Sequence, residues 1–233
     1  ITLQDVTVTS TNSDSTFVIE HNYCDSSIEV GNVTMTAGAG EDAYFSIQHN
    51  ADYISGDGQA TVGNVSITAG SDATFVVDNN GEDYDVTLGD IEVTAGDDIS
   101  FTLDNGWDAA DIIGATNITL TATAQEDGNS HISAFISDAH DVSTLTLVST
   151  ASDGDYVSGD VYMWSDASLS TVDLSAMGAN TGVVLNLENL NAWETDAVNI
   201  TVGEGDLTAF VDDWNNTQET FEFVGTDIGT IVI

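Results

Sequence analysis

The sequence predicts an all-β fold, a three-sided parallel β-solenoid (β-helix) of about eight coils. Three observations lead to this prediction: one short segment recurs along almost the whole chain, each copy alternates apolar with polar residues, and Gly, Asp, Asn and Ser separate the copies. Stacked repeats can bury an apolar face that one repeat cannot bury alone. We expect residues 1–233 to form a single solenoid domain.

The repeat is clearest in three segments that begin at Gly31, Gly63 and Gly89, continue with Asn or Asp and an alternating stretch, and end in Thr-Ala-Gly. Equivalent apolar anchors extend the pattern in both directions, at spacings of 27, 32, 26, 27, 27, 27 and 26 residues. A period of about 27 residues over this length indicates a solenoid. The anchors are Val6, Val33, Val65, Ile91, Ile118, Leu145, Val172 and Val198.

Each repeat contains three candidate strands. The first begins at the anchor and alternates apolar residues with Thr, Ser or Asn, which predicts a strand with one buried face. The second contains a phenylalanine in the first four repeats, and the third is a shorter apolar stretch before the next anchor. We expect a core that includes Val33, Met35, Phe45, Ile47, Val65, Ile67, Phe75, Val77, Ile91, Val93, Phe101 and Leu103.

A β-sandwich is the alternative all-β fold, and its turns recur about every 8–12 residues. A sandwich gives no reason for the same strand to return at a constant spacing, so the repeat favours the solenoid. Adjacent coils of a solenoid lie about 4.8 Å apart, and eight coils would therefore form a rod about 40 Å long.

The charge balance restricts the possible functions. The chain has 40 Asp and Glu residues, no Lys or Arg, and a formal net charge of −40. Nucleic-acid binding and docking to anionic lipid both depend on basic side chains, so we expect no nucleic-acid partner. No apolar run approaches about 18 residues, so we expect no membrane insertion. The field of the chain attracts cations, which makes divalent cations expected partners.

An acidic column is expected beside the second strands. Asp14, Asp42, Asp72 and Asp98 each stand three residues before a phenylalanine, so stacking would place their carboxylates about 5 Å apart. Neighbouring pairs then repel by roughly 1 kcal/mol in bulk water, and by more near a protein surface. Two interpretations stay open: a metal site for Ca²⁺, which prefers oxygen ligands, and a solvated acidic edge that diffuse ions screen.

A second column follows the second strands, where Asn22, Asn50 and Asn80 align and His21 and His49 stand beside the first two. Stacked Asn side chains form hydrogen-bonded ladders along parallel strands, which is the structural interpretation. Zinc binding by the two histidines is the alternative, although two histidines without a third ligand are a weak signal.

Threonines recur on the outer face of the first strands. Flat threonine arrays are similar to the faces of ice-binding solenoids, whereas Thr also simply suits β-structure. Glu92, Val148 and Asp173 interrupt the array. The members of the array are Thr7/Thr9, Thr34/Thr36, Ser66/Thr68 and Thr119/Thr121.

Sequons for N-glycosylation also occur in the sequence. They start at Asn32, Asn64, Asn117, Asn199 and Asn215.

The pattern Gly-Asn-Val-x-Ile-Thr-Ala-Gly-x-Asp-Ala-x-Phe at residues 63–75 resembles the repetitive β-solenoid regions of bacterial surface-layer proteins, large secreted adhesins and appendage subunits. This resemblance implies an acidic extracellular or cell-surface protein, often dependent on calcium, that builds coats, filaments or attachments. The calcium-binding nonapeptide Gly-Gly-x-Gly-x-Asp is absent from the sequence, so that particular calcium site is not carried over.

We expect a structural protein and not an enzyme. Asp residues recur so regularly that no single pair identifies a hydrolase. Lyases that act on acidic sugars need a strong base or a cation near the substrate, and the chain has no Lys or Arg to serve. A polyanionic substrate would also be repelled.

The last residues of the sequence form an apolar strand with no cap after it, and the first coil resembles an interior coil. A bare strand edge can add to the sheet of a neighbour, and such head-to-tail contacts propagate into fibres or lattices. We therefore expect copies of the chain to self-assemble into an extracellular filament, tube or surface layer, through Ile228, Ile231, Val232 and Ile233.

The alternative function is a cation-dependent adhesin, or an ice-binding or glycan-binding solenoid segment of a larger secreted protein. Aromatic side chains would then be the expected glycan contacts. The candidates are Trp107, Trp164, Trp193 and Trp214.

Overall fold

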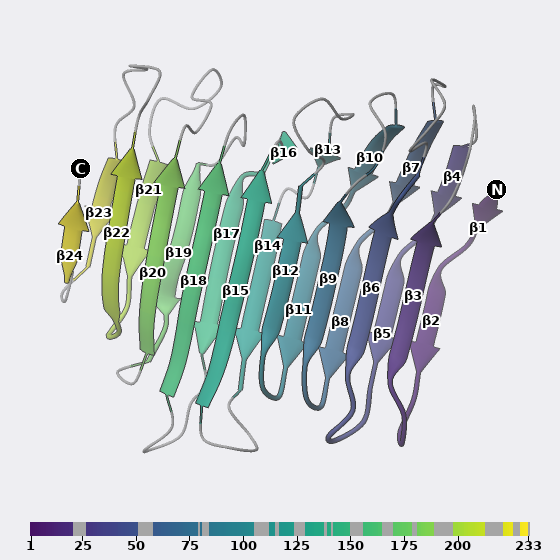
Figure 1. Cartoon of the computed structure of the whole chain (residues 1–233), viewed down its shortest axis with the longest axis horizontal. Coiled ribbons are helices and arrows are strands. Elements are labelled where there is room, and N and C mark those ends of the chain that lie inside the picture. Colours follow the sequence, from purple (N-terminus) through teal and green to yellow (C-terminus); the bar gives the residue numbers. More distant parts are fainter. Residues whose placement is uncertain are drawn as a thin grey trace.

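Three parallel β-sheets wind around one apolar core in the computed structural model, which makes the chain a β-solenoid (Figure 1). The structure describes residues 1–20, 27–50, 58–78, 80, 84–104, 112–114, 117–123, 129–137, 139–140, 142–149, 156–164, 170–178, 181–188, 198–212, 221–225 and 229–232. The all-β class, the three sides and the period of about 27 residues are confirmed. Within these described ranges no helix is long and apolar enough to cross a membrane.

The three sheets differ in length. Sheet A contains β1 (Thr2–Leu3), β4 (Ser27–Val30), β7 (Gly58–Val62), β10 (Tyr84–Leu88), β13 (Ile112–Gly114) and β16 (Ala139–His140). Sheet B contains β2 (Val6–Thr9), β5 (Val33–Thr36), β8 (Val65–Ala69), β11 (Ile91–Ala95), β14 (Asn117–Ala122), β17 (Thr144–Ser149), β19 (Thr171–Ala176), β21 (Val198–Val202) and β23 (Phe221–Val224). Sheet C contains β3 (Ser15–Glu20), β6 (Ala43–Gln48), β9 (Ala73–Asp78), β12 (Ile99–Leu103), β15 (Asn129–Ser137), β18 (Tyr156–Trp164), β20 (Thr181–Glu188), β22 (Asp206–Asp212) and β24 (Thr230–Val232).

Sheet A has six strands among the described residues, so the three-sided section extends over about six turns, slightly fewer than the eight that the sequence predicts. Sheets B and C each have nine strands and run from one end of the rod to the other (Figure 1). All pairs of neighbouring strands are parallel, which is the pairing that a solenoid of one repeating coil must produce.

The predicted anchors stack in register in sheet B. Val33 pairs with Val65, and Val65 pairs with Ile91, as the repeat predicts. The last predicted anchor is wrong: Val172 pairs with Ile200, not with Val198. Successive side chains of a strand alternate between its faces, so a slip of two residues keeps the same face and leaves the apolar pattern unchanged.

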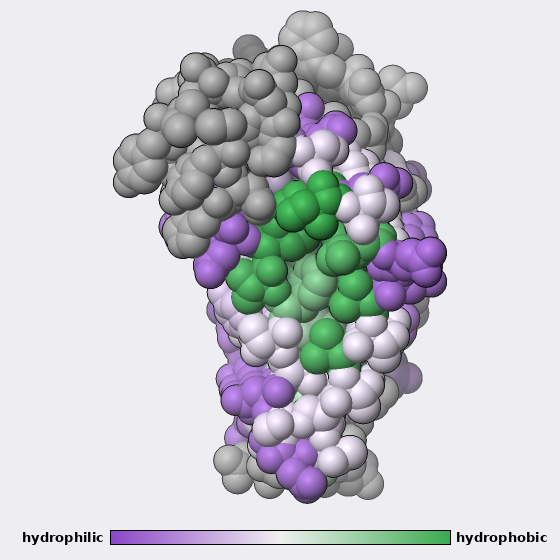
Figure 2. Space-filling model, turned by 90° about the vertical axis from the view of Figure 1, so that its right-hand side faces the viewer, coloured by the Kyte–Doolittle hydropathy of each residue, from purple (hydrophilic) through white to green (hydrophobic). Residues whose placement is uncertain are grey.

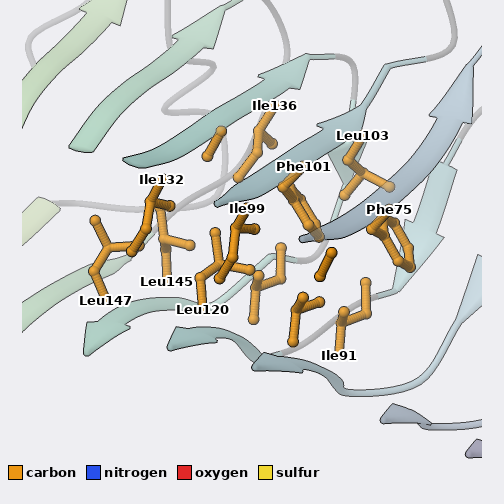
Figure 3. Close-up of a cluster of buried hydrophobic side chains, with 14 of the residues drawn as sticks. Phe75, Ile91, Ile99, Phe101, Leu103, Leu120, Ile132, Ile136, Leu145 and Leu147 are labelled. Carbon is orange, nitrogen blue, oxygen red and sulfur yellow. The ribbon is translucent and has the colours of Figure 1, made fainter. Parts of the chain in front are cut away.

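All twelve predicted core side chains are buried, at 1% exposure or less. In sheet C the rings of Phe17, Phe45, Phe75 and Phe101 form a continuous stack, with centroid distances of 5.3, 4.8 and 4.8 Å. Figure 3 shows Phe75 and Phe101 meeting the aliphatic side chains of sheet B across the core. Stacked aromatic pairs contribute roughly 0.5–1.5 kcal/mol each beyond their buried area.

Tyr84 is the largest fully buried side chain in the part of the chain that the structure describes. Its hydroxyl has no hydrogen-bond partner there. Burial disfavours the phenolate and raises the pKa of Tyr84 to about 12. The interior beside β10 is therefore dry enough to resist ionisation of this group.

Candidate functional surfaces

A ladder of Asp and Asn side chains occupies the corner before sheet B, and we call it the A–B ladder. The side-chain Oδ1 of each of the first four members accepts a hydrogen bond from the backbone N–H of the equivalent residue one coil later, at 2.9–3.2 Å. Each coil thereby satisfies a backbone donor of the next coil at the point where the strands have not yet begun. The members are Asp5, Asn32, Asn64, Asp90 and Asn117.

The glycine before three of the ladder residues, Asn32, Asn64 and Asp90, is required by close approach of neighbouring coils. A Cβ on Gly63 would lie 2.8 Å from Oδ1 of Asn32, and Gly31 and Gly89 face the same obstruction from Asp5 and Asn64. At the next corner a Cβ on Gly70 would collide with the backbone oxygen of Gly38. The repeated Gly-Asx pair therefore allows neighbouring coils to stack closely and to form a hydrogen bond at this corner.

The A–B ladder was not predicted from the sequence, because four of the asparagines at this point of the repeat match glycosylation sequons. The signal that identifies it is the exchange of Asn for Asp at one position of the repeat. Asp5 and Asp90 stand where Asn32 and Asn64 stand in other coils, and both residue types supply an Oδ1 acceptor. The Thr or Ser two positions later follows from the outward face of the strand.

The predicted acidic column does form, at the corner before sheet C, and we call it the B–C ladder. The carboxylate Oδ1 atoms of Asp14, Asp42 and Asp72 accept the backbone N–H of the next aspartate at 3.1–3.2 Å. Oδ1 of Asp98 accepts the N–H of His131 at 2.8 Å, and there the run of aspartates ends. The aspartates therefore stack because each carboxylate accepts a hydrogen bond from a backbone N–H group of the next coil.

The B–C ladder assigns one oxygen of each carboxylate to the backbone, which leaves the second oxygen as the available ligand. Ca²⁺ takes about 6–8 oxygen ligands in proteins. Within the described ranges, no group of three or more His, Cys, Asp or Glu side chains is arranged to hold a metal ion.

The third corner, after sheet C, holds a buried pair of asparagines. Nδ2 of Asn50 donates to Oδ1 of Asn80 at 2.8 Å, and the two amides also donate to the backbone oxygens of Ile19 and Ile47. The predicted asparagine ladder is therefore confirmed for this pair, while His21 and Asn22 lie outside the described residues. His49 precedes the pair with a φ of 56°, a left-handed conformation that is uncommon for a residue with a Cβ.

A histidine bridges two side chains on the outer face of sheet C, where the B–C ladder ends. His131 Nδ1 lies 2.7 Å from Ser158 Oγ, and Nε2 lies 3.5 Å from Asp160 Oδ2. Serine, histidine and aspartate are the groups of a hydrolytic triad, and no sequence motif predicts that these three residues meet. The Asp160 side chain is 61% exposed, so water screens this contact strongly and the cluster has the character of a surface pair.

Threonines form an unbroken column on the outer face of sheet B. Thr9, Thr36, Thr68, Thr94 and Thr121 pair in register across five strands. Val148 follows Thr121, as the sequence predicts, whereas Glu92 and Asp173 interrupt only the neighbouring column.

Of the predicted assembly residues, Ile231 and Val232 lie in β24, at the end of sheet C, and are 39% and 44% exposed. Ile228 and Ile233 lie outside the described residues. The same holds for Trp107, Trp193 and Trp214, and the backbone of Trp164 closes β18.

The chain matches no protein-family model, no curated protein and no solved structure. Its function is therefore argued from the geometry and charge of its own surfaces.

Proposed function

We propose that this chain is a structural, non-catalytic β-solenoid that stacks end to end with copies of itself in an extracellular filament, tube or surface layer. The observation that supports the proposal is the pair of matching end faces of the rod. Both faces carry apolar side chains from the inward columns of the sheets, together with parallel strand edges of the same polarity.

The N-terminal face belongs to the first coil. Ile1 is 75% exposed and Leu3 is 46% exposed, and Val6, Val8 and Phe17 are only partly buried against the core. Figure 2 shows this face as an apolar centre surrounded by polar surface. In the equivalent second coil, Val30, Val33, Met35 and Phe45 are all buried, because a further coil covers them.

The C-terminal face is formed by β23 and β24. Phe221 and Phe223 are partly buried, and Ile231 is 39% exposed. Ile231 ends the inward column of sheet C that begins at Phe17 and runs through the phenylalanine stack. A copy added in the same register would place Phe17 against Ile231, and Val6 against Phe223.

Charge sets the conditions for this assembly. Each copy carries a formal net charge of −40, so copies repel one another until cations screen them. Divalent cations are therefore the expected cofactors of assembly, with Ca²⁺ the first to test. Cation-rich surroundings outside a cell suit such a chain, as does the absence of Lys and Arg, which leaves no site for trypsin-type proteases. Surface-layer proteins, adhesins and appendage subunits of bacteria are the proposed class.

Further coils of a longer chain would occupy the same edges, so the test uses the 233-residue chain itself. Leu3→Asp combined with Ile231→Asp places a charge on each end face. We expect the parent chain to form polymers in CaCl₂, measured by light scattering, and the double variant to form none. Thr34→Asp combined with Thr68→Asp adds the same charge on the outer face of sheet B and should leave end-to-end growth unchanged. Parent chains that never elongate, or an end variant that elongates like the control, would refute the proposal.

Ice binding is the second candidate function, and the unbroken threonine column of sheet B favours it. Thr68 lies at the centre of this column on an exposed strand face. Thr68→Tyr and Thr36→Tyr would each disrupt a flat array, so both should abolish thermal hysteresis. Parent protein that neither shows hysteresis nor shapes ice crystals would eliminate this candidate.

A further inference from the structure

Two outward-facing columns run along the middle of sheet C through all nine strands, and together we call them the sheet C stripe. The first column contains Thr16, Tyr44, Thr74, Ser100, Ser133, Asp160, Val184, Thr208 and Thr230. The second contains Val18, Ser46, Val76, Thr102, Phe135, Tyr162, Asn186, Phe210 and Val232.

The sheet C stripe is almost free of charge. Asp160 is the one carboxylate in either column, although 17% of the residues in the chain are acidic. That carboxylate contacts Nε2 of His131 at 3.5 Å. Beside β3 to β12 the flanking columns contain acidic residues, with the B–C ladder on one side and Glu20 and Asp78 on the other. The stripe is therefore nearly uncharged along its length, and acidic residues border it beside β3 to β12.

The stripe also carries four of the eight exposed large apolar side chains in the described part of the chain. Val18, Tyr44, Phe210 and Val232 are 36–44% exposed and all lie on it. Phe135 and Tyr162 stack along it, with ring centroids 5.4 Å apart. The outer face of sheet B carries threonine at the corresponding places, as described above.

We propose that the sheet C stripe pairs the rod side by side with a second copy of the same chain. A chain without Lys or Arg cannot neutralise the carboxylates of another copy. Close packing of two copies therefore has the lowest electrostatic cost where both have few carboxylates, and the stripe meets this requirement on each partner. A basic protein would instead gain most from the acidic borders, where the charge is.

The dimensions of the stripe suit a specific contact between two copies. Nine strands at about 4.8 Å spacing give a length of about 40 Å, and two columns with their side chains give a width of about 13 Å. Each copy would bury about 500 Å², or about 1,000 Å² for the pair, which is near the lower limit for a specific interface. A two-fold axis lets the same surface serve both partners, and the pair closes on itself.

Lateral pairing does not depend on end-to-end stacking, because the two contacts use different surfaces. The test therefore uses the chain with blocked ends, Leu3→Asp combined with Ile231→Asp, in CaCl₂. Sedimentation velocity over a concentration series should show a dimer. Adding Tyr44→Asp and Phe210→Asp should yield a monomer, with the dimer Kd raised at least about tenfold. Adding Thr34→Asp and Thr68→Asp, which carry the same charge on sheet B, should preserve the dimer.

Circular dichroism and thermal melting verify that each variant is folded. If the aspartates disturb sheet C, Tyr44→Ser combined with Phe210→Ser removes the apolar surface without charge and should also weaken the dimer. An end-blocked chain that stays monomeric overturns the proposal, and so does a dimer that survives both stripe variants. A monomer whose stripe instead retains a neutral oligosaccharide, and loses it in the Ser variant, would assign the surface to a glycan and likewise overturn the pairing.

Discussion

The part of the rod up to β12 and the part from β15 onward stack their coils by different means. Up to β12, Asp and Asn side chains connect coils at the corners and phenylalanines stack in the core. From β15 onward the phenylalanine column continues as Ala134, Val161, Leu185 and Ala209. The strands of sheet C lengthen there to 7–9 residues in β15, β18, β20 and β22.

The comparison shows two ways to satisfy backbone groups between coils. Short strands need corner ladders, because the backbone N–H groups just before these strands are not hydrogen-bonded within the sheet. Longer strands bring those donors into the sheet itself. The corner ladders also require an Asx at a fixed place, and three rungs of the A–B ladder add a glycine before it, which explains why the repeat is most regular where they occur.

The core supplies the largest expected contrast. Phe75→Ala removes a ring from the middle of the stack and should cost about 4 kcal/mol of unfolding free energy. Leu185→Ala, in the same column of the later part, should cost about 3 kcal/mol, since no ring stacking is lost. Chemical denaturation of both variants measures the difference. A larger loss for Leu185→Ala would show that the stack adds nothing.

Alkaline pH tests how dry the earlier core is. Folding raises the pKa of Tyr84 from 10.0 to about 12, so the unfolded chain releases this proton first as the pH rises. Stability should therefore be complete below pH 10 and fall by on the order of 2 kcal/mol between pH 10 and 12. Tyr84→Phe should reduce this loss, and Tyr44→Phe, at an exposed tyrosine, should not. Equal pH profiles for the two variants would contradict the assignment.

Glycine substitutions should have opposite signs in the two parts. Gly70→Ala forces a Cβ against the backbone of the preceding coil and should cost about 1–3 kcal/mol. A Cβ on Gly159, in β18, finds its nearest neighbour at an ordinary 3.4 Å. Gly159→Ala should therefore stabilise by up to about 1 kcal/mol, because the unfolded chain loses freedom. Equal decreases in melting temperature for Gly70→Ala and Gly159→Ala would show that the strand accommodates an added Cβ no better than the corner does.

The acidic ladder supplies the smallest expected effect. Asp72→Asn retains an Oδ1 acceptor for Asp98 and removes a charge that lies between two others. It should raise stability by about 0.5 kcal/mol at low salt and reduce the stabilisation that CaCl₂ gives to the parent chain. Asp206→Asn, in the later part, is the control and should change neither quantity as much. A Ca²⁺ response that is the same in all three chains would limit the role of cations to general screening.

The period, the strand faces and the earlier core could be read from the sequence because they follow from alternation and spacing alone. The position of Ile200 could not, since Val198 and Ile200 satisfy the same alternation two residues apart. The acidic column could be located but not explained, because spacing does not show that Asp42 Oδ1 accepts the N–H of Asp72. The contact of His131 with Asp160 depends on side-chain geometry across two coils, which no local motif encodes.

Cryo-electron microscopy of the 233-residue chain, concentrated in CaCl₂, tests the proposed end-to-end stacking most directly. End-to-end stacking predicts rods in which the solenoid axis is the fibre axis. Strand spacing of about 4.8 Å should then continue from one copy into the next without a break. Single rods no longer than one chain at all concentrations, or polymers whose strands run along the fibre axis, would contradict it.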